Sequence, residues 1–126
     1  FATIAALANA PIAPARPLDG VNLIPYLNGT NSVAPHDAIY LRMFDKGGFA
    51  VRSQDHKLVI PGKGSAPQLF DVTGDVGETK NLAEARPKVL QELEQRRAAW
   101  NAQLVEPVFE GLLSPKARQK ARATAD

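Results

Sequence analysis

The 126-residue sequence contains no cysteine and only two histidines, His36 and His56. Without cysteine the chain can form neither a disulfide bond nor a thiolate metal site, and its composition says nothing about the redox compartment. The histidines stand twenty residues apart, so a proton relay or a metal site would need the fold to bring them together. The simpler expectation is that His56 packs at the start of a strand and His36 lies in a loop.

Long apolar runs are also missing. The first apolar stretch, Phe1 to Ala8, is too short to span a bilayer or to form a complete signal peptide. Because the chain opens without an initiator Met, we expect it to be a piece of a longer protein, called the parent below. We expect no membrane partner. The location stays unknown, and it would be periplasmic or secreted if the parent carries a signal peptide.

The net charge of +2 comes from residues 115–126, which carry +3, because everything before Pro115 sums to about −1. A nucleic-acid-binding domain usually carries a basic stripe with aromatic side chains on its folded face, and this chain has only a basic tail at 106–126. We expect that tail to be a solvated end, and we expect no nucleic-acid partner. A nucleic-acid accessory role is the least favoured alternative, and it predicts salt-dependent binding that deletion of residues 115–126 abolishes.

The first 35 residues favour a short helix followed by a proline-rich connector. Thr3 to Ala10 is rich in alanine and has apolar residues at helical spacing. Three prolines within seven residues then predict an extended connector over Ala10 to Pro17. Leu18 to Gly29 predicts a turn, one or two helical turns and a second turn. Asn28-Gly29-Thr30 matches a glycosylation acceptor, but Asn-Gly is first of all a turn dipeptide.

Four short runs with β-type composition follow, each bounded by Gly, Pro, Asp or Ser. Turn-length gaps between them predict an antiparallel meander of about four strands. Within the second run we expect Phe49 and Val51 on one face and Ala50 and Arg52 on the other. The four predicted strands are Ala38–Met43, Phe49–Arg52, Lys57–Ile60 and Gln68–Val72.

The polar segment after these strands predicts turns rather than catalytic residues. We expect a turn at Asp75 to Gly77, and we expect the Asn81 side chain to satisfy backbone groups ahead of the last helix. Glu78 and Asn81 therefore have structural roles in this interpretation. Isolated carboxylates such as Asp45, Asp55 and Asp71 fall at predicted turns or strand ends and do not assemble a calcium site.

The last predicted element is an amphipathic helix from Pro87 to Leu104, since proline is favoured in a first helical turn. A helix of this kind and a sheet with one uncovered face form a two-layer core, so the predicted fold class is α+β. We expect Trp100→Ala to be the most destabilising single truncation. The predicted apolar stripe consists of Val89, Leu90, Leu93, Trp100 and Leu104.

Several short sequence motifs of the chain, in their order and spacing over about residues 1 to 105, resemble the C-terminal subdomain of the sulfatases. The resemblance is to arylsulfatase-like members of the alkaline phosphatase superfamily. The motifs are Pro17-Leu18-Asp19-Gly20, Ala50-Val51-Arg52 before His56-Lys57-Leu58-Val59, Gln68-Leu69-Phe70-Asp71-Val72, Gly77-Glu78 and Asn81-Leu82-Ala83.

The resemblance implies that the parent hydrolyses sulfate esters. In that family a Cys or Ser within Cys/Ser-x-Pro-x-Arg becomes formylglycine, and a divalent cation, usually calcium, holds the sulfate. The nearest match here, Ile12-Ala13-Pro14-Ala15-Arg16, has an aliphatic residue at the modified position, and the chain has no Asp-Asp or Asp-Asn pair. We therefore expect no catalytic residue, no metal site and no cofactor in this fragment, and calcium and formylglycine in the parent.

The resemblance also implies a division of the chain and a set of partners. Residues 1–35 would belong to the parent's main domain, 36–105 would form the C-terminal subdomain, and 106–126 would be the basic tail. The subdomain would cover the N-terminal catalytic domain and shape the pocket rim, where Arg42 and His56 are the candidate contacts to a sulfated small molecule or glycan. The alternative is a free-standing binding or interaction module without hydrolase activity, which an upstream Cys/Ser-x-Pro-x-Arg motif would argue against.

Overall fold

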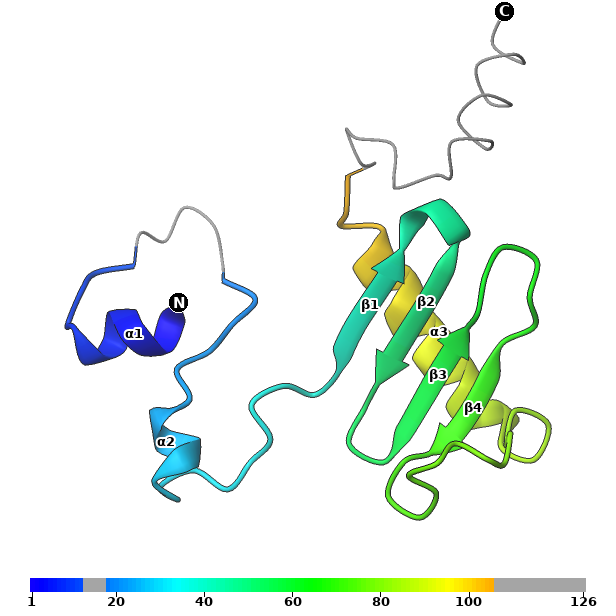
Figure 1. Ribbon diagram of the computed structural model, residues 1–126, viewed down its shortest axis with the longest axis horizontal. Coiled ribbons are helices and arrows are strands. Elements are labelled where there is room, and N and C mark those ends of the chain that lie inside the picture. Colours follow the sequence, from blue (N-terminus) through cyan, green and yellow to red (C-terminus); the bar gives the residue numbers. More distant parts are fainter. Residues whose placement is uncertain (13–17, 106–126) are drawn as a thin grey trace, which may run out of the picture. The chain divides into compact units, whose positions relative to one another are not determined.

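The computed structural model describes residues 1–12 and 18–105, and it divides into two units, Phe1–Asp37 and Ala38–Asp126, which are treated separately. The second unit is a four-stranded antiparallel sheet with one long helix, which confirms the predicted α+β fold (Figure 1). Most of the proline-rich connector and the whole basic tail lie outside the described residues. No helix in the described part of the chain has the length and apolar character to cross a membrane.

The N-terminal unit contains two short helices, α1 (Ala2–Leu7) and α2 (Ile24–Leu27). Helix α1 ends before the predicted Ala10, because Asn9 adopts a left-handed backbone conformation with φ +49°. The Thr3 hydroxyl accepts a hydrogen bond from the backbone N–H of Leu23 at 3.1 Å, which ties α1 to the segment ahead of α2. The predicted order of turn, short helix and turn is confirmed.

The turn after α2 is built by the Asn28-Gly29-Thr30 sequence. Asn28 Oδ1 accepts hydrogen bonds from the Thr30 backbone N–H at 3.0 Å and from the Thr30 hydroxyl at 2.8 Å. Gly29 has φ +75°, a conformation that glycine adopts without steric cost. The structure therefore confirms the turn that was predicted here.

The sheet is a meander of β1 (Ile39–Met43), β2 (Gly48–Arg52), β3 (His56–Ile60) and β4 (Gln68–Asp71), in that spatial order. Each strand pairs antiparallel with the next, as the turn-length gaps predicted. A single 3-10 turn, η1 (Phe44–Lys46), separates β1 from β2.

Helix α3 (Pro87–Asn101) covers one face of this sheet (Figure 1). Leu93 of the helix packs with Val51, Leu58 and Leu69 of the strands in the buried core, and Leu58 and Leu69 are fully buried. Phe49 and Val51 share a face, as expected, because Val51 enters the core and Phe49 lies 4.9 Å beneath the guanidinium of Arg97 in α3.

The structure corrects the end of the predicted apolar stripe. Helix α3 ends at Asn101, and the chain then turns, with the Leu104 backbone N–H donating to the Asn101 carbonyl at 3.1 Å. Leu104 is therefore 39% exposed and does not continue the stripe. Trp100 is half-buried and stacks on Tyr40 of β1, with ring centroids 5.1 Å apart.

Candidate functional site

The face of the sheet that α3 leaves uncovered is largely apolar. We call it the open face, and strand alternation assigns to it Ile39, Leu41, Met43, Ala50, Arg52, Lys57, Val59, Gln68 and Phe70, of which Phe70 is buried. An antiparallel sheet that faces water on one side normally carries polar residues there. Here the three β1 side chains of the open face are 53%, 56% and 51% exposed. The open face therefore departs from the polar pattern expected of a sheet face in water.

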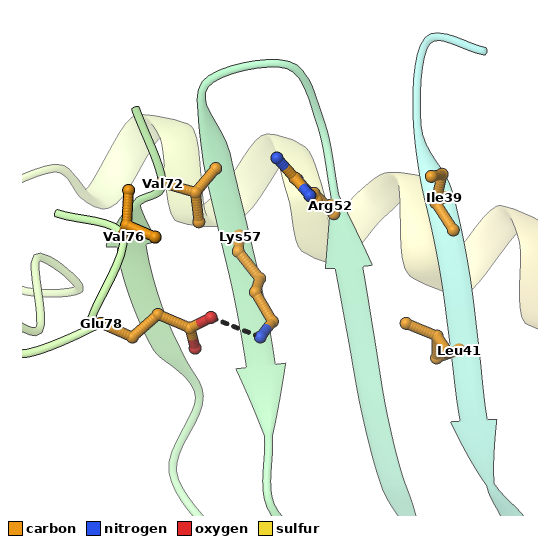
Figure 2. A pocket seen from close by; sticks show the side chains of 7 residues that line it. All are labelled: Ile39, Leu41, Arg52, Lys57, Val72, Val76 and Glu78. Atoms are coloured by element: carbon orange, nitrogen blue, oxygen red, sulfur yellow. Dashed lines mark hydrogen bonds and ion pairs between the residues drawn. The ribbon is translucent and has the colours of Figure 1, made fainter. Parts of the chain in front are cut away.

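One end of the open face holds a depression of about 350 Å³. Arg52 and Lys57 stand directly opposite each other on β2 and β3, and like charges in that position repel. Glu78 relieves this only in part, because its Oε1 accepts from Lys57 Nζ at 2.6 Å (Figure 2). Arg52 is exposed and has no hydrogen bond or ion pair within 1–12 and 18–105. The depression is lined by Ile39, Leu41, Arg52, Lys57, Val72, Val76 and Glu78.

The backbone around Glu78 holds its side chain toward Lys57. Glu78 has φ +53°, an unfavourable region for a residue with a side chain. Its backbone N–H donates to the Asp75 carbonyl at 3.0 Å, which closes the turn predicted at Asp75 to Gly77. Glu78 thus has the structural role expected of it, with an ion pair that the sequence did not identify.

Two carboxylates stabilise the loop between β4 and α3. The hydroxyl of Thr73 and the backbone N–H of Gly74 donate to Asp71, and these hydrogen bonds lower the pKa of Asp71 to about 2. The backbone N–H groups of Lys80 and Thr79 lower the pKa of Asp75 in the same way. Both groups are ionised hydrogen-bond acceptors at neutral pH, so neither is suited to general acid or base catalysis there.

Asn81 joins this loop to the sheet. Its Oδ1 accepts the backbone N–H of Leu69 and the backbone N–H of Ala83, each at 3.0 Å. One side chain thus satisfies a donor on β4 and a donor ahead of α3. This confirms the backbone-bonding role predicted for Asn81.

The two candidate substrate contacts, Arg42 and His56, lie at different ends of the sheet. His56 is opposite Asp71 in the β3–β4 pairing, and its Nε2 is 2.6 Å from Nη1 of Arg86, which in turn lies 3.5 Å from the Asp71 carboxylate. Arg42 is opposite Phe49 in the β1–β2 pairing, and its guanidinium is 4.9 Å from the ring centroid of Phe44. The structure does not bring the two candidates together.

The described residues contain no group of three or more His, Asp or Glu side chains that could hold a metal ion. His36 lies in a loop of the N-terminal unit, as expected. Most of the nearest match to the nucleophile motif, residues 13–16, falls outside the described residues.

Sequence reasoning missed the grouping of Arg52, Lys57 and Glu78. The predicted alternation put Arg52 on the face opposite Val51, which is correct, and the β1 pattern could have placed Leu41 beside it. Pairing Lys57 with Glu78 needed the path of the loop, because 21 residues separate them. The contacts of Arg86 and Arg97 were also missed, since neither residue stands in a motif.

Comparison with known proteins shows what the chain is similar to in sequence. No family model matches the chain. Arylsulfatase A of Bos taurus is 33% identical over 121 residues, covering 74% of this chain and 24% of that protein. The chain is homologous to the sulfatases. It spans about a quarter of the length of this curated relative.

Solved structures show that this sulfatase homologue shares its fold with segments of larger proteins. Ps i-CgsB in complex with k-i-k-neocarrahexaose matches 97% of this chain with a TM-score of 0.76, at 21% identity and over 27% of its own length. BT1596, a 2-O GAG sulfatase, matches 93% of this chain with a TM-score of 0.61, at 22% identity and over 30% of its own length. At these identities the likeness concerns the fold.

Proposed function

We propose that this sulfatase homologue is the C-terminal part of a sulfate ester hydrolase and takes no direct part in the chemistry. One observation carries the proposal: the chain matches bovine arylsulfatase A at 33% identity over only 24% of that protein. The predicted order of sulfatase motifs along the chain agrees with it. The alternative of a free-standing binding module has no specific support among the described residues.

The catalytic apparatus of this hydrolase would lie in the rest of the polypeptide. A formylglycine nucleophile needs a Cys or Ser precursor, and this chain has no cysteine and an isoleucine at the nearest motif match. Calcium takes six or more oxygen ligands, and the described carboxylates Asp71 and Asp75 are engaged by loop hydrogen bonds. Both groups are therefore proposed for the parent and not for this chain.

The sulfated substrate is proposed to be a small molecule or a glycan, because the solved structures that share the fold include a complex with k-i-k-neocarrahexaose and a 2-O GAG sulfatase. Arg42 and His56 remain the candidate contacts at the pocket rim. A guanidinium such as that of Arg42 can bind sulfate oxygens in a bidentate manner. Both candidates also have contacts within the chain, Arg42 with the ring of Phe44 and His56 with Arg86.

The test compares sulfate release by the full-length polypeptide from a chromogenic aryl sulfate and from a sulfated oligosaccharide. We expect turnover that calcium chelation reduces and that replacement of the Cys or Ser of an upstream Cys/Ser-x-Pro-x-Arg motif by Ala abolishes. A full-length protein that binds these sulfated compounds without turning them over would instead favour the binding module. Turnover that survives loss of the upstream nucleophile would contradict the proposal.

The rim assignment is tested by Arg42→Ala in the full-length polypeptide, with Arg96→Ala as the matched control. Arg96 lies on α3 and pairs with Glu92 at 2.8 Å, so it reports the loss of a surface arginine alone. We expect Arg42→Ala to raise KM about tenfold, the loss of one charge-assisted hydrogen bond. Equal KM values for the two variants would remove Arg42 from the rim.

A further inference from the structure

We propose that the open face of the sheet is the surface on which the catalytic part of the same polypeptide docks, with a carboxylate of that part opposite Arg52. This inference rests on the proposed function, and it adds which face makes the contact and which residue anchors it. It follows from the apolar character of the face, from its unbalanced charge and from the length of sulfatase chain that lies outside this segment.

The exposed apolar side chains indicate that another protein surface covers the open face. Among residues 1–12 and 18–105, helix α3 supplies the second layer, on one side of the sheet (Figure 1). On the other side Ile39, Leu41 and Met43 line up along β1 with at least half of each side chain exposed, and Val76 nearby is 84% exposed. Sheets that carry apolar residues on both faces are normally covered on both. A contiguous exposed patch of this kind marks an interaction site.

The charge of the open face indicates which charge the covering surface must have. Arg52 and Lys57 are directly opposite, and the one carboxylate lining the depression, Glu78, is engaged by Lys57 at 2.6 Å. Among residues 1–12 and 18–105, Arg52 is therefore left with an uncompensated positive charge beside the apolar side chains of β1. A partner that buried Arg52 without a carboxylate would leave an uncompensated charge, which is strongly unfavourable. The partner surface is thus mainly apolar with an acidic residue facing Arg52.

The rest of the polypeptide fits this description better than a second copy does. The chain corresponds to 24% of a sulfatase relative, so about three quarters of such a polypeptide lies outside it and is tethered to it. In a symmetric dimer the same patch would face itself, and Arg52 would meet the like-charged patch of its copy. The excess positive charge therefore disfavours self-association through this face.

Thiol labelling tests the proposal, because the chain contains no cysteine of its own. Leu41→Cys places a thiol on the open face in the middle of the edge strand β1, and Gln95→Cys places one at an exposed position of α3 as the matched control. Each variant is made in the isolated chain and in the full-length polypeptide. A maleimide pulse is followed by digestion and mass spectrometry of the peptide that carries the new thiol.

We expect the Leu41→Cys thiol to react at least tenfold more slowly in the full-length polypeptide than in the isolated chain, and the Gln95→Cys thiol to react equally in both. Equal reactivity of the Leu41→Cys thiol in both contexts overturns the proposal. So does protection in the isolated chain that increases with its concentration, which would indicate a second copy.

A second measurement does not depend on the cysteine variants. Arg52→Glu should lower the thermal midpoint of the full-length polypeptide by several degrees and should not lower that of the isolated chain, where it replaces the repulsion from Lys57 by an attraction. Lys88→Glu, at an exposed position of α3, is the control and should change neither. An equal shift for Arg52→Glu in both contexts would show a role within this chain and contradict the docking contact.

Sulfatase activity of the same preparations separates this inference from the proposed function. An active full-length protein with a freely reactive Leu41→Cys thiol refutes the docking face and leaves the hydrolase proposal standing. An inactive full-length protein with a protected thiol refutes the hydrolase proposal and supports the docking face.

Discussion

At the scale of single residues, burial places Leu58 among the most sensitive core positions. Its side chain is fully buried in the cluster formed with Val51, Leu69 and Leu93, whereas Trp100 is half-buried. We therefore expect Leu58→Ala to lower the free energy of unfolding by about 2–5 kcal/mol. Trp100→Ala should cost about 1–3 kcal/mol, including the lost stacking on Tyr40, in place of the largest effect that the sequence predicted.

Urea unfolding of the isolated chain followed by circular dichroism measures these differences. Leu104→Ala is the control and should be nearly neutral, because Leu104 lies beyond the end of α3. A larger loss for Trp100→Ala than for Leu58→Ala would show that the tryptophan holds α3 to the sheet more firmly than its burial indicates.

Asp71 makes the stability of the fold depend on pH in the acidic range. Hydrogen bonds from Thr73 and Gly74 lower the pKa of Asp71 to about 2 in the folded chain, below its ordinary 3.8. Because the folded pKa is the lower one, the contribution is complete above pH 4 and is lost as the pH falls through 2. We expect Asp71→Asn, which keeps a neutral acceptor, to flatten the fall of the urea midpoint between about pH 4 and 2. An unchanged pH profile would contradict this assignment.

Residue roles could be predicted from sequence where the contact is local. Asn81 and the Asn28-Gly29-Thr30 turn were placed correctly, because a short polar side chain binds backbone groups close to it in sequence. The contact of Arg86 with His56 spans 30 residues and follows only from the packing of α3 against β3. No pattern within either segment carries that information.

At the scale of elements, the β1–β2 connection depends on Gly47. Gly47 has φ +63°, and a Cβ added there would lie 3.1 Å from the Lys63 Cβ. We expect Gly47→Ala to destabilise the chain by about 1–3 kcal/mol through backbone strain and crowding together. Gly64→Ala, at φ +79° with no atom within 4 Å, separates the strain from the crowding and should cost less. Thermal melts of the two variants and of Gly20→Ala, a position with open space, measure the difference.

The strands were predicted more accurately than the end of the last helix. Gly, Pro and Asp punctuate every strand, so each predicted strand lies within a residue or so of the observed one. Helix α3 has Pro87 at its start but no glycine at its end, and Leu104 continues the apolar spacing after the helix has stopped. A helix end without a C-terminal glycine is therefore easily predicted too late.

At the scale of the whole molecule, the resemblance to sulfatases could be recognised from the sequence, whereas the proposed docking surface could not. Strand alternation shows which residues share a face, but which face the helix covers depends on the chain path between β4 and α3. Only the structure shows that Leu41 and Arg52 lie on the open face while Leu58 is buried. The proposed docking surface becomes visible once that choice is known.

The central claim is that this chain is a non-catalytic part of a sulfate ester hydrolase. The most direct test measures sulfate release from an aryl sulfate, with calcium present, by the isolated chain and by the full-length polypeptide at equal molar concentration. We predict turnover by the full-length polypeptide and none above background by the isolated chain. Turnover by the isolated chain, abolished by a substitution within residues 1–126, would contradict the account, since it would require a nucleophile and a metal site in this segment.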